Sequence, residues 1–258
     1  MKRFFLLLAV AMIGFTTSSY TSEARDYYQV KIYRIDKDSQ ETLLDQYLQT
    51  AYIPALHRSG IENVGVFKPI EGKNGTERFV MVFIPFTSLT EFEQLDKKLS
   101  TDKEYLKKGK AYIEAPHDAP PYNRIESILM RSFTSMPHFA IPKLDSKPSE
   151  RVYEFRSYEG ATEQLYERKV EMFNDAGEVE LFKKLEFNPV FFAEVISSAH
   201  MPHLIYMTTF TDEDSQKAHW DAFSAHPEWE KMKAMDRYQN TVSSITKYLM
   251  YPTDYSDI

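Results

Sequence analysis

The sequence predicts an α+β fold in which two tandem ferredoxin-like units, each of order β-α-β-β-α-β, close one barrel within the chain. The first observation is a long-range repeat, because the segment 28–33 (YQVKIY) recurs 125 positions later as 153–158 (YEFRSY). A period this long indicates two copies of one domain. The second is that strand and helix patterns alternate in the same order in both copies. The third is geometric, since two such units can bury the sheet faces that their helices leave bare.

The repeat extends through both copies. The offset of 125 matches Asn63 to Asn188 and Phe67 to Phe192, and it lays 79–82 on 204–207. One residue is then lost, because the segment 102–105 aligns with 226–229. Near the ends of the copies, Ile125, Leu129 and Met130 match Ile245, Leu249 and Met250. We therefore expect the two copies to share their strands and helices.

Each element of the first copy has a local sequence signal. The expected elements are a strand at 27–35, a helix from 39 to 60, strands at 62–70 and 77–86, helices from 88 and around 105, and a strand at 123–133. Ser39 is a helix-capping residue, and Pro54 should kink the first helix. The pair Asn74-Gly75 favours a hairpin. Ser88 and Glu91 form a capping box at the start of the next helix.

The second copy repeats this order. We expect strands at 151–158, 187–197, 203–210 and 241–251, and helices at 161–185 (broken near Gly177), 213–224 and 227–237. A proline-containing segment without periodicity separates the copies. The predicted organisation is a signal peptide at 1–24, a degenerate first domain at 25–135, a linker at 136–149 and a second domain at 150–258.

The N-terminal segment has the layout of a secretory signal. A basic start precedes an apolar run from Phe4 to Phe15, and small residues stand at Ser22 and Ala24, where a signal peptidase reads. The run is too short to span a bilayer comfortably. We predict cleavage after Ala24 and export to the periplasm or the medium of a bacterium, with an uncleaved membrane anchor as the alternative.

Composition excludes several classes of function. The chain has no cysteine, which excludes disulfides, thiol nucleophiles and cysteine-based metal sites. Its net charge is −7 and no basic run occurs, which argues against nucleic acid as a partner. With 18 Phe and 17 Tyr, the chain has the apolar material for a large core.

Two motifs of the second copy resemble a known family. The strand segment 152–158 (VYEFRSY) and the helical segment 219–229 (HWDAFSAHPEW) are similar to motifs of NIPSNAP domains. The resemblance implies the dimeric α/β-barrel superfamily, whose relatives include cofactor-free monooxygenases, isomerases and haem-binding enzymes. The first copy is degenerate, with Tyr105 where Trp229 stands. The family implies no settled biochemical activity.

A polar row on the first strand of the second copy is the main candidate binding site. Glu154, Arg156 and Tyr158 alternate onto one face of the strand. If that face borders a cavity, the three side chains could orient a carboxylate or an enol. The alternatives are a solvated strand face and a structural Glu–Arg pair.

A second cluster contains four unusual side chains. His219, Trp220, His226 and Trp229 lie on the last two helices. The functional interpretation makes His219 or His226 a catalytic acid or base, or a haem ligand, with Trp220 and Trp229 in the binding site. The structural interpretation packs the tryptophans against the sheet and makes His226 a helix cap.

His200 and His203 are the weakest candidates. They stand three residues apart in a turn, a spacing that zinc or copper sites use only with further ligands. The alternative is a pair of solvated hairpin side chains, and we predict no metal.

These observations favour an exported binding or interaction module with no cofactor. The alternative is a monooxygenase, an isomerase or a haem protein that acts on a small hydrophobic molecule in the second copy. We expect a small hydrophobic ligand, no nucleic acid, and self-association through sheet or helix faces. Because the first copy is degenerate, we expect at most one site, in residues 150–258.

Overall fold

The computed structural model describes residues 24–258. The predicted signal peptide and its membrane-anchor alternative lie almost entirely outside the described residues. The first half of the described chain comprises β1 (Tyr27–Arg34), α1 (Asp38–Tyr47), α2 (Ile53–Arg58), β2 (Gly65–Pro69), β3 (Phe79–Phe86), α3 (Leu89–Thr101), α4 (Lys103–Lys108), α5 (Lys110–Ile113) and β4 (Arg124–Ser132). The second half comprises β5 (Val152–Glu159), α6 (Glu163–Asn174), α7 (Glu178–Lys184), β6 (Pro189–Ser197), β7 (His203–Phe210), α8 (Glu213–Ser224), α9 (Pro227–Lys233) and β8 (Ser244–Pro252).

The eight strands form one closed antiparallel barrel in the order β1-β3-β2-β8-β5-β7-β6-β4. Each half contributes four adjacent strands, and the halves join where β2 pairs with β8 and where β4 pairs with β6. This arrangement confirms the predicted α+β fold with two β-α-β-β-α-β units and one barrel.

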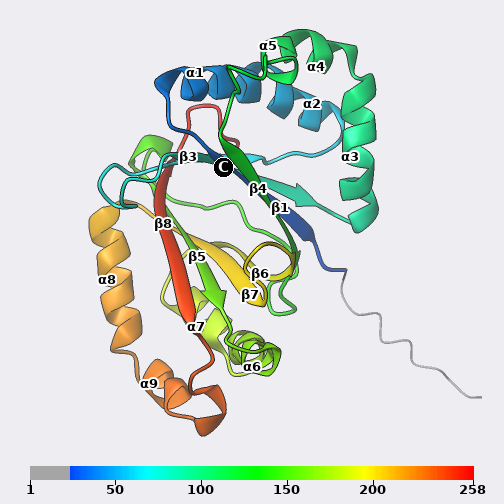
Figure 1. The fold of residues 1–258 in the computed structure, drawn as a ribbon. Coiled ribbons are helices and arrows are strands. Elements are labelled where there is room, and N and C mark those ends of the chain that lie inside the picture. The colour runs from blue at the N-terminus through cyan, green and yellow to red at the C-terminus, as the bar shows by residue number, and fades with distance from the viewer. Residues whose placement is uncertain (1–23) are drawn as a thin grey trace, which may run out of the picture.

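The helices cover the outside of the barrel. In Figure 1 the helices of the first half gather at the top of the view, and those of the second half lie at the left and bottom, with the strands between them. One apolar cluster fills the barrel interior and draws on all eight strands. Two further clusters lie between the barrel and the helices of each half. Because alternate residues of a strand point to opposite faces, every strand serves both an inner and an outer core.

Local signals in the sequence predict most element boundaries. The segment Leu48–Tyr52 is π-helical and leads directly into α2, where Pro54 occupies the first turn. An irregularity of this kind is expected just before an interior proline. Gly177 has a φ of +97°, in the left-handed region, and separates α6 from α7 as predicted.

The strand pairing corrects the predicted alignment of the two halves at two of the four strand pairs, β2 with β6 and β3 with β7. In the first half Tyr33 pairs with Val80, and in the second half its equivalent Tyr158 pairs with Leu204. Position 80 therefore corresponds to 204, not to 205, so the residue is lost earlier than we expected. Phe67 lies inside the barrel whereas Phe192 lies in the outer core, so these two residues are not equivalent. A β-bulge near Pro189 accounts for the shift, because it adds one residue to β6.

Within residues 24–258, no helix has the length and apolar character needed to cross a membrane.

Candidate functional site

The polar row of β5 faces the helices, not the barrel interior. Tyr153 and Phe155 point into the barrel core. Glu154 instead accepts hydrogen bonds from two residues of α8, and Tyr158 packs in the outer core. The row is therefore covered by protein rather than solvated.

Glu154 is the anchor of the row. Its side chain has no exposed surface, and both carboxylate oxygens accept hydrogen bonds. Arg156 Nε donates to Oε1 at 2.7 Å, while Gln216 Nε2 and Trp220 Nε1 donate to Oε2 at 2.8 and 2.6 Å. A buried carboxylate is tolerated when it is paired and fully hydrogen-bonded, as it is here. Glu154 thus fixes the orientation of Arg156 and of the Trp220 indole.

Arg156 connects the row to its neighbours. Its guanidinium lies 3.7 Å from the centre of the Trp220 ring and donates from Nη1 to the Tyr158 hydroxyl at 3.2 Å. Burial alone would lower the pKa of Arg156, but Tyr206, Tyr158 and Glu154 raise it above its ordinary value. The residue is a permanent cation that lies over an aromatic ring.

A pocket of about 330 Å³ opens above this network. It is lined by Arg156, Tyr158, Glu178, Trp220, Phe223, Ser224 and Trp229. Phe223 lies in ring contact with both Trp220 and Trp229, at centroid distances of 5.5 and 4.8 Å. Four of the five predicted binding residues line the pocket, and the fifth, Glu154, holds two of those four in place.

A buried ion pair that the sequence patterns did not predict lies at the pocket. Lys169 Nζ of α6 lies 2.7 Å from Glu178 Oε2 of α7, and both residues are almost fully buried. Burial raises the pKa of Glu178, although the Lys169 ammonium acts in the opposite direction. A signal existed, because Lys169 interrupts the apolar stripe that continues at Met172 and Phe173. A charged residue at such a position indicates a buried partner.

The two candidate catalytic histidines do not line this pocket. The His219 ring packs against Phe187 and Phe210, and its Nδ1 lies 2.6 Å from the Ser215 carbonyl oxygen, to which it donates. His226 is the N-cap of α9, where its ring accepts from the Glu228 amide at 3.2 Å. Each has a structural role.

A histidine-ligated haem does not fit this pocket. Such a haem needs an imidazole that faces an open space. No histidine is among the lining residues, and the rings of His219 and His226 are engaged elsewhere.

His200 and His203 lie in different environments. His200 is exposed, whereas His203 is 2% exposed and points into one end of the barrel. The expectation that both are solvated is therefore wrong for His203. Its ring nitrogens lie 2.7 and 2.5 Å from the hydroxyls of Ser157 and Ser198. Burial, with a smaller effect of His200, lowers the pKa of His203 to about 4. No group of three metal-ligating side chains occurs in residues 24–258.

Tyrosines pack around the equivalent position in the first half. Lys31 stands where Arg156 does, and its ammonium lies 5.3 and 5.1 Å from the rings of Tyr33 and Tyr52. Tyr47 and Tyr112 stack with ring centres 3.7 Å apart. Tyrosine rings thus surround Lys31 in the first half, whereas a tryptophan lies beside Arg156 in the second half.

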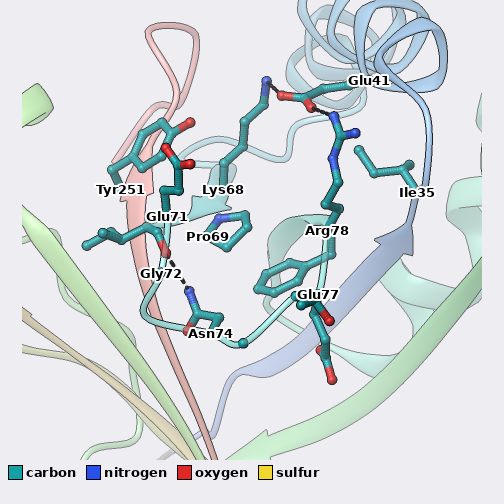
Figure 2. A pocket seen from close by; sticks show the side chains of 14 residues that line it. Ile35, Glu41, Lys68, Pro69, Glu71, Gly72, Asn74, Glu77, Arg78 and Tyr251 are labelled. Carbon is teal, nitrogen blue, oxygen red and sulfur yellow. Dashed lines mark hydrogen bonds and ion pairs between the residues drawn. The ribbon is translucent and has the colours of Figure 1, made fainter.

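A second pocket, of about 360 Å³, lies in the first half inside the loop that joins β2 to β3. Figure 2 shows Lys68 and Arg78 reaching Glu41 from opposite sides. Lys68 also pairs with Asp45, and Arg78 with Asp38. Because these cations are satisfied by neighbouring carboxylates, the charged groups of this pocket serve to hold the loop.

Comparison with known proteins gives one family match. Residues 153–257 match the NIPSNAP family model. The NIPSNAP match therefore covers the second half, which contains the pocket of Arg156 and Trp220. None of the curated proteins matches the chain.

Solved structures resemble the whole barrel. A candidate monooxygenase from Fusobacterium nucleatum has a TM-score of 0.56 at 9% identity, covering 89% of this chain and 93% of its own. A candidate monooxygenase from Lactobacillus acidophilus scores 0.55 at 6% identity, covering 88% and 94%. An anthrone oxidase-like protein scores 0.53 at 10% identity, covering 90% and 93%. At these identities the likeness shows a shared fold.

Proposed function

We propose that the second half of the barrel binds a small planar aromatic molecule that carries a carbonyl, hydroxyl or carboxylate oxygen. The observation that carries this proposal is the mixed lining of the second-half pocket. Three aromatic residues, Trp220, Phe223 and Trp229, line it together with Tyr158 and with Arg156, whose guanidinium lies against the Trp220 ring. Ligand pockets in proteins combine apolar walls with a few polar groups in this way, and 330 Å³ lies within their usual size range.

The aromatic residues of the pocket suit a flat ligand. Trp220, Phe223 and Trp229 line the pocket, and the Phe223 ring contacts both tryptophan rings. Offset and edge-to-face contacts between aromatic rings add stability beyond the burial of area. The indole of Trp220 is fixed by its hydrogen bond to Glu154, so little conformational entropy is lost when a ligand packs on it.

The polar residues of the pocket suit a ligand oxygen that carries negative charge. The Arg156 guanidinium uses Nε and Nη1 on Glu154 and Tyr158, and its Nη2 makes no hydrogen bond within the described chain. A charge-assisted hydrogen bond from Nη2 would recognise a carboxylate, a phenolate or an enolate.

Intrinsic fluorescence and calorimetry test this proposal. The chain has two tryptophans, and both line the pocket, so tryptophan emission reports on this site alone. We expect 2-naphthoate to bind more tightly than naphthalene, which lacks the carboxylate, and than cyclohexanecarboxylate, which lacks the aromatic ring. Binding of all three with equal affinity would contradict the proposal.

A pair of matched variants locates the binding. Arg156→Gln should weaken 2-naphthoate binding by about tenfold or more, as expected for the loss of one charge-assisted contact. Lys31→Gln changes the equivalent residue of the first half and should leave binding unchanged. If the two variants weaken binding equally, the ligand does not bind in the second-half pocket.

Cofactor-independent oxygenation is the second candidate function. It is favoured by the shared barrel fold of the two candidate monooxygenases and the anthrone oxidase-like protein, together with a pocket that suits a tricyclic phenol or ketone. Oxygen uptake with anthrone as the substrate tests it. Uptake above the buffer rate that is lost in Arg156→Gln supports oxygenation, whereas uptake at the buffer rate leaves the pocket a binding site.

We also propose that the protein is exported and that its two halves derive from duplicated domains. The apolar run Phe4 to Phe15 and the small residues before Arg25 support export. The mass of the protein recovered from the native host should correspond to a chain that begins at Arg25. A recovered mass that includes Met1 to Ala24 would contradict this expectation.

A further inference from the structure

We propose that the second-half pocket transfers a proton, with Glu178 accepting it from a carbon next to a ligand carbonyl while Tyr158 and Arg156 hold the enolate oxygen that forms. This inference rests on the proposed function, because it names ketones that can enolise as the ligand class of the same pocket. Three structural observations support it: an oriented hydroxyl, a free guanidinium nitrogen, and a carboxylate with one unpaired oxygen.

The hydrogen bonds of Tyr158 and Tyr206 indicate that the Tyr158 hydroxyl proton points toward the pocket. The hydroxyls of Tyr158 and Tyr206 lie 2.7 Å apart, and Tyr206 is fully buried. Within the described chain, Tyr158 is the only partner that the Tyr206 hydroxyl has. If Tyr158 donated to Tyr206, the proton of Tyr206 would be buried without an acceptor, which is costly.

The favoured arrangement therefore has Tyr206 donating to Tyr158. Arg156 also donates to the Tyr158 oxygen, at 3.2 Å, so both lone pairs of that oxygen are used. The remaining proton of Tyr158 is left without an acceptor in the protein. Because Tyr158 lines the pocket, this proton is available to a ligand oxygen there.

Arg156 supplies the second donor. Its Nη2 lies on the same guanidinium as Nη1, which already contacts Tyr158. A ligand oxygen that accepts from Tyr158 is therefore within reach of Nη2. Two preorganised donors of this kind stabilise an oxyanion more than they stabilise a neutral carbonyl, and a difference of that kind lowers the barrier to enolate formation.

Glu178 has the position and the environment of a general base. Lys169 occupies Oε2, and no hydrogen bond reaches Oε1 within residues 24–258. The residue lines the pocket although it is only 2% exposed. Burial raises its pKa, which makes the carboxylate a stronger proton acceptor than one in water.

The proposed step needs no other reactant. The bond between the α-carbon and its hydrogen breaks, and the proton moves to Glu178 Oε1. The electron pair moves into the new carbon–carbon double bond, and the carbonyl electrons move to the oxygen that faces Tyr158 and Arg156. Return of the proton to the same or to a conjugated carbon gives exchange or isomerisation. Lys169 acts as a positioning residue, because its ammonium holds Glu178 through Oε2 and favours the carboxylate form.

Deuterium exchange measures the step directly. We would incubate 2-tetralone with the protein in deuterated water and follow loss of the α-proton signals by NMR. Exchange should exceed the buffer rate and fall by about tenfold or more in both Glu178→Gln and Tyr158→Phe, as expected for loss of a base or of an oxyanion donor. Tyr158→Phe removes no charge, so it keeps the test meaningful if Glu178→Gln does not fold.

Glu228→Gln is the matched control, because Glu228 is an exposed glutamate of α9 that pairs with Lys184. It should retain full exchange. The rate of the wild-type protein should rise with pH through one ionisation above the ordinary glutamate pKa, and a purely structural role of Glu178 would not produce that profile.

The outcomes separate this inference from the proposed function. If 2-tetralone quenches tryptophan emission but exchanges at the buffer rate, proton transfer is wrong and ligand binding stands. If exchange is fast and unchanged in both Glu178→Gln and Tyr158→Phe, these residues do not carry it. If 2-tetralone and 2-naphthoate both fail to bind, the proposed function is wrong as well.

Discussion

Asn74 and Leu249 exchange two hydrogen bonds across one of the two lines where the halves of the barrel meet. The Asn74 amide donates from Nδ2 to the Leu249 carbonyl at 2.7 Å, and its Oδ1 accepts from the Leu249 amide at 2.8 Å. The Ile70 amide donates to the same carbonyl at 2.9 Å. Because β2 pairs with β8 only over Phe67–Pro69, the side chain of Asn74 extends a short strand pairing.

We expect Asn74→Ala to lower the free energy of unfolding by about 1–3 kcal/mol, because it removes the two hydrogen bonds to Leu249 and a longer one to the Ile70 carbonyl, and leaves the Leu249 amide without its acceptor. Urea unfolding measures the change. Lys73→Ala, in the same loop, removes an exposed ion pair with Glu213 and should cost less than about 1 kcal/mol. Equal losses in the two variants would mean that the Asn74 bonds do not stabilise the junction.

Glu154→Gln should destabilise the second half. It keeps the size of the side chain but leaves Arg156 without its carboxylate, and breaking a buried ion pair costs about 3–5 kcal/mol. The tryptophan emission should also shift, because Trp220 Nε1 loses a charged acceptor. Gln29 occupies the equivalent position in the first half and donates to Ser127 in an exposed setting. Gln29→Ala is therefore a control with an expected cost below about 1 kcal/mol.

A double-mutant cycle should show strong coupling between Lys169 and Glu178. Lys169→Met and Glu178→Gln should each cost about 3–5 kcal/mol, because each leaves a buried group without its partner. The double variant should cost clearly less than the sum of the two single variants. If the losses of unfolding free energy in the two single variants add up to the loss in the double variant, Lys169 and Glu178 do not stabilise each other.

The burial of His203 predicts acid sensitivity. Its folded-state pKa of about 4 lies below the ordinary value of 6.5, so the unfolded chain binds a proton that the folded chain refuses. The stabilisation is complete above pH 6.5 and declines as the pH falls from 6.5 toward 4. The shift corresponds to at most about 3 kcal/mol.

Thermal unfolding between pH 7 and pH 4 measures this decline. His203→Gln keeps polar contacts available to Ser157 and Ser198 and should show a shallower decline. His203 contacts those two serines and lines one cavity with His200, Glu159, Glu126 and Arg34. A decline that persists unchanged in His203→Gln must therefore come from other titratable groups.

The fold could be predicted because hydrophobic periodicity, and the capping, glycine and proline residues that begin or end an element, are local properties of the sequence. Residues 213–224 were predicted as a helix with the boundaries that α8 has. The barrel followed from the repeat, since two units with bare sheet faces have one compact way to cover them. The register errors at Phe67 and Val80 also have local causes, which are a β-bulge in β6 and a connection between β6 and β7 that is shorter than the one between β2 and β3. A β-bulge changes the face on which a residue lies without leaving a signal in composition.

The candidate site was predictable only in part. The alternation of side chains along a strand predicted that Glu154, Arg156 and Tyr158 share one face of β5. It could not show whether that face is covered by a helix, is exposed to solvent or points into the barrel. Trp220 of α8 and Trp229 of α9 reach the pocket through tertiary contacts, among them the hydrogen bond from Trp220 to Glu154 of β5. Lys169 and Glu178 stayed unrecognised because the break at Gly177 turns α7 back toward α6. His219 and His226 were candidates because histidine often acts as an acid, a base or a ligand. In the structure, His219 donates a hydrogen bond within its own helix, and His226 is the N-cap of α9.

The closed barrel has a consequence for stoichiometry. A barrel built from two identical chains would carry two identical pockets, and ligand binding at one could influence the other across the shared sheet. Here both units belong to one polypeptide, and the first half has tyrosines around Lys31 where the second half has Trp220 beside Arg156. Occupancy of the chain should therefore follow a simple hyperbola, with one ligand per polypeptide and a Hill coefficient of about one. The first half is then free to accumulate substitutions that would be unacceptable at a binding site.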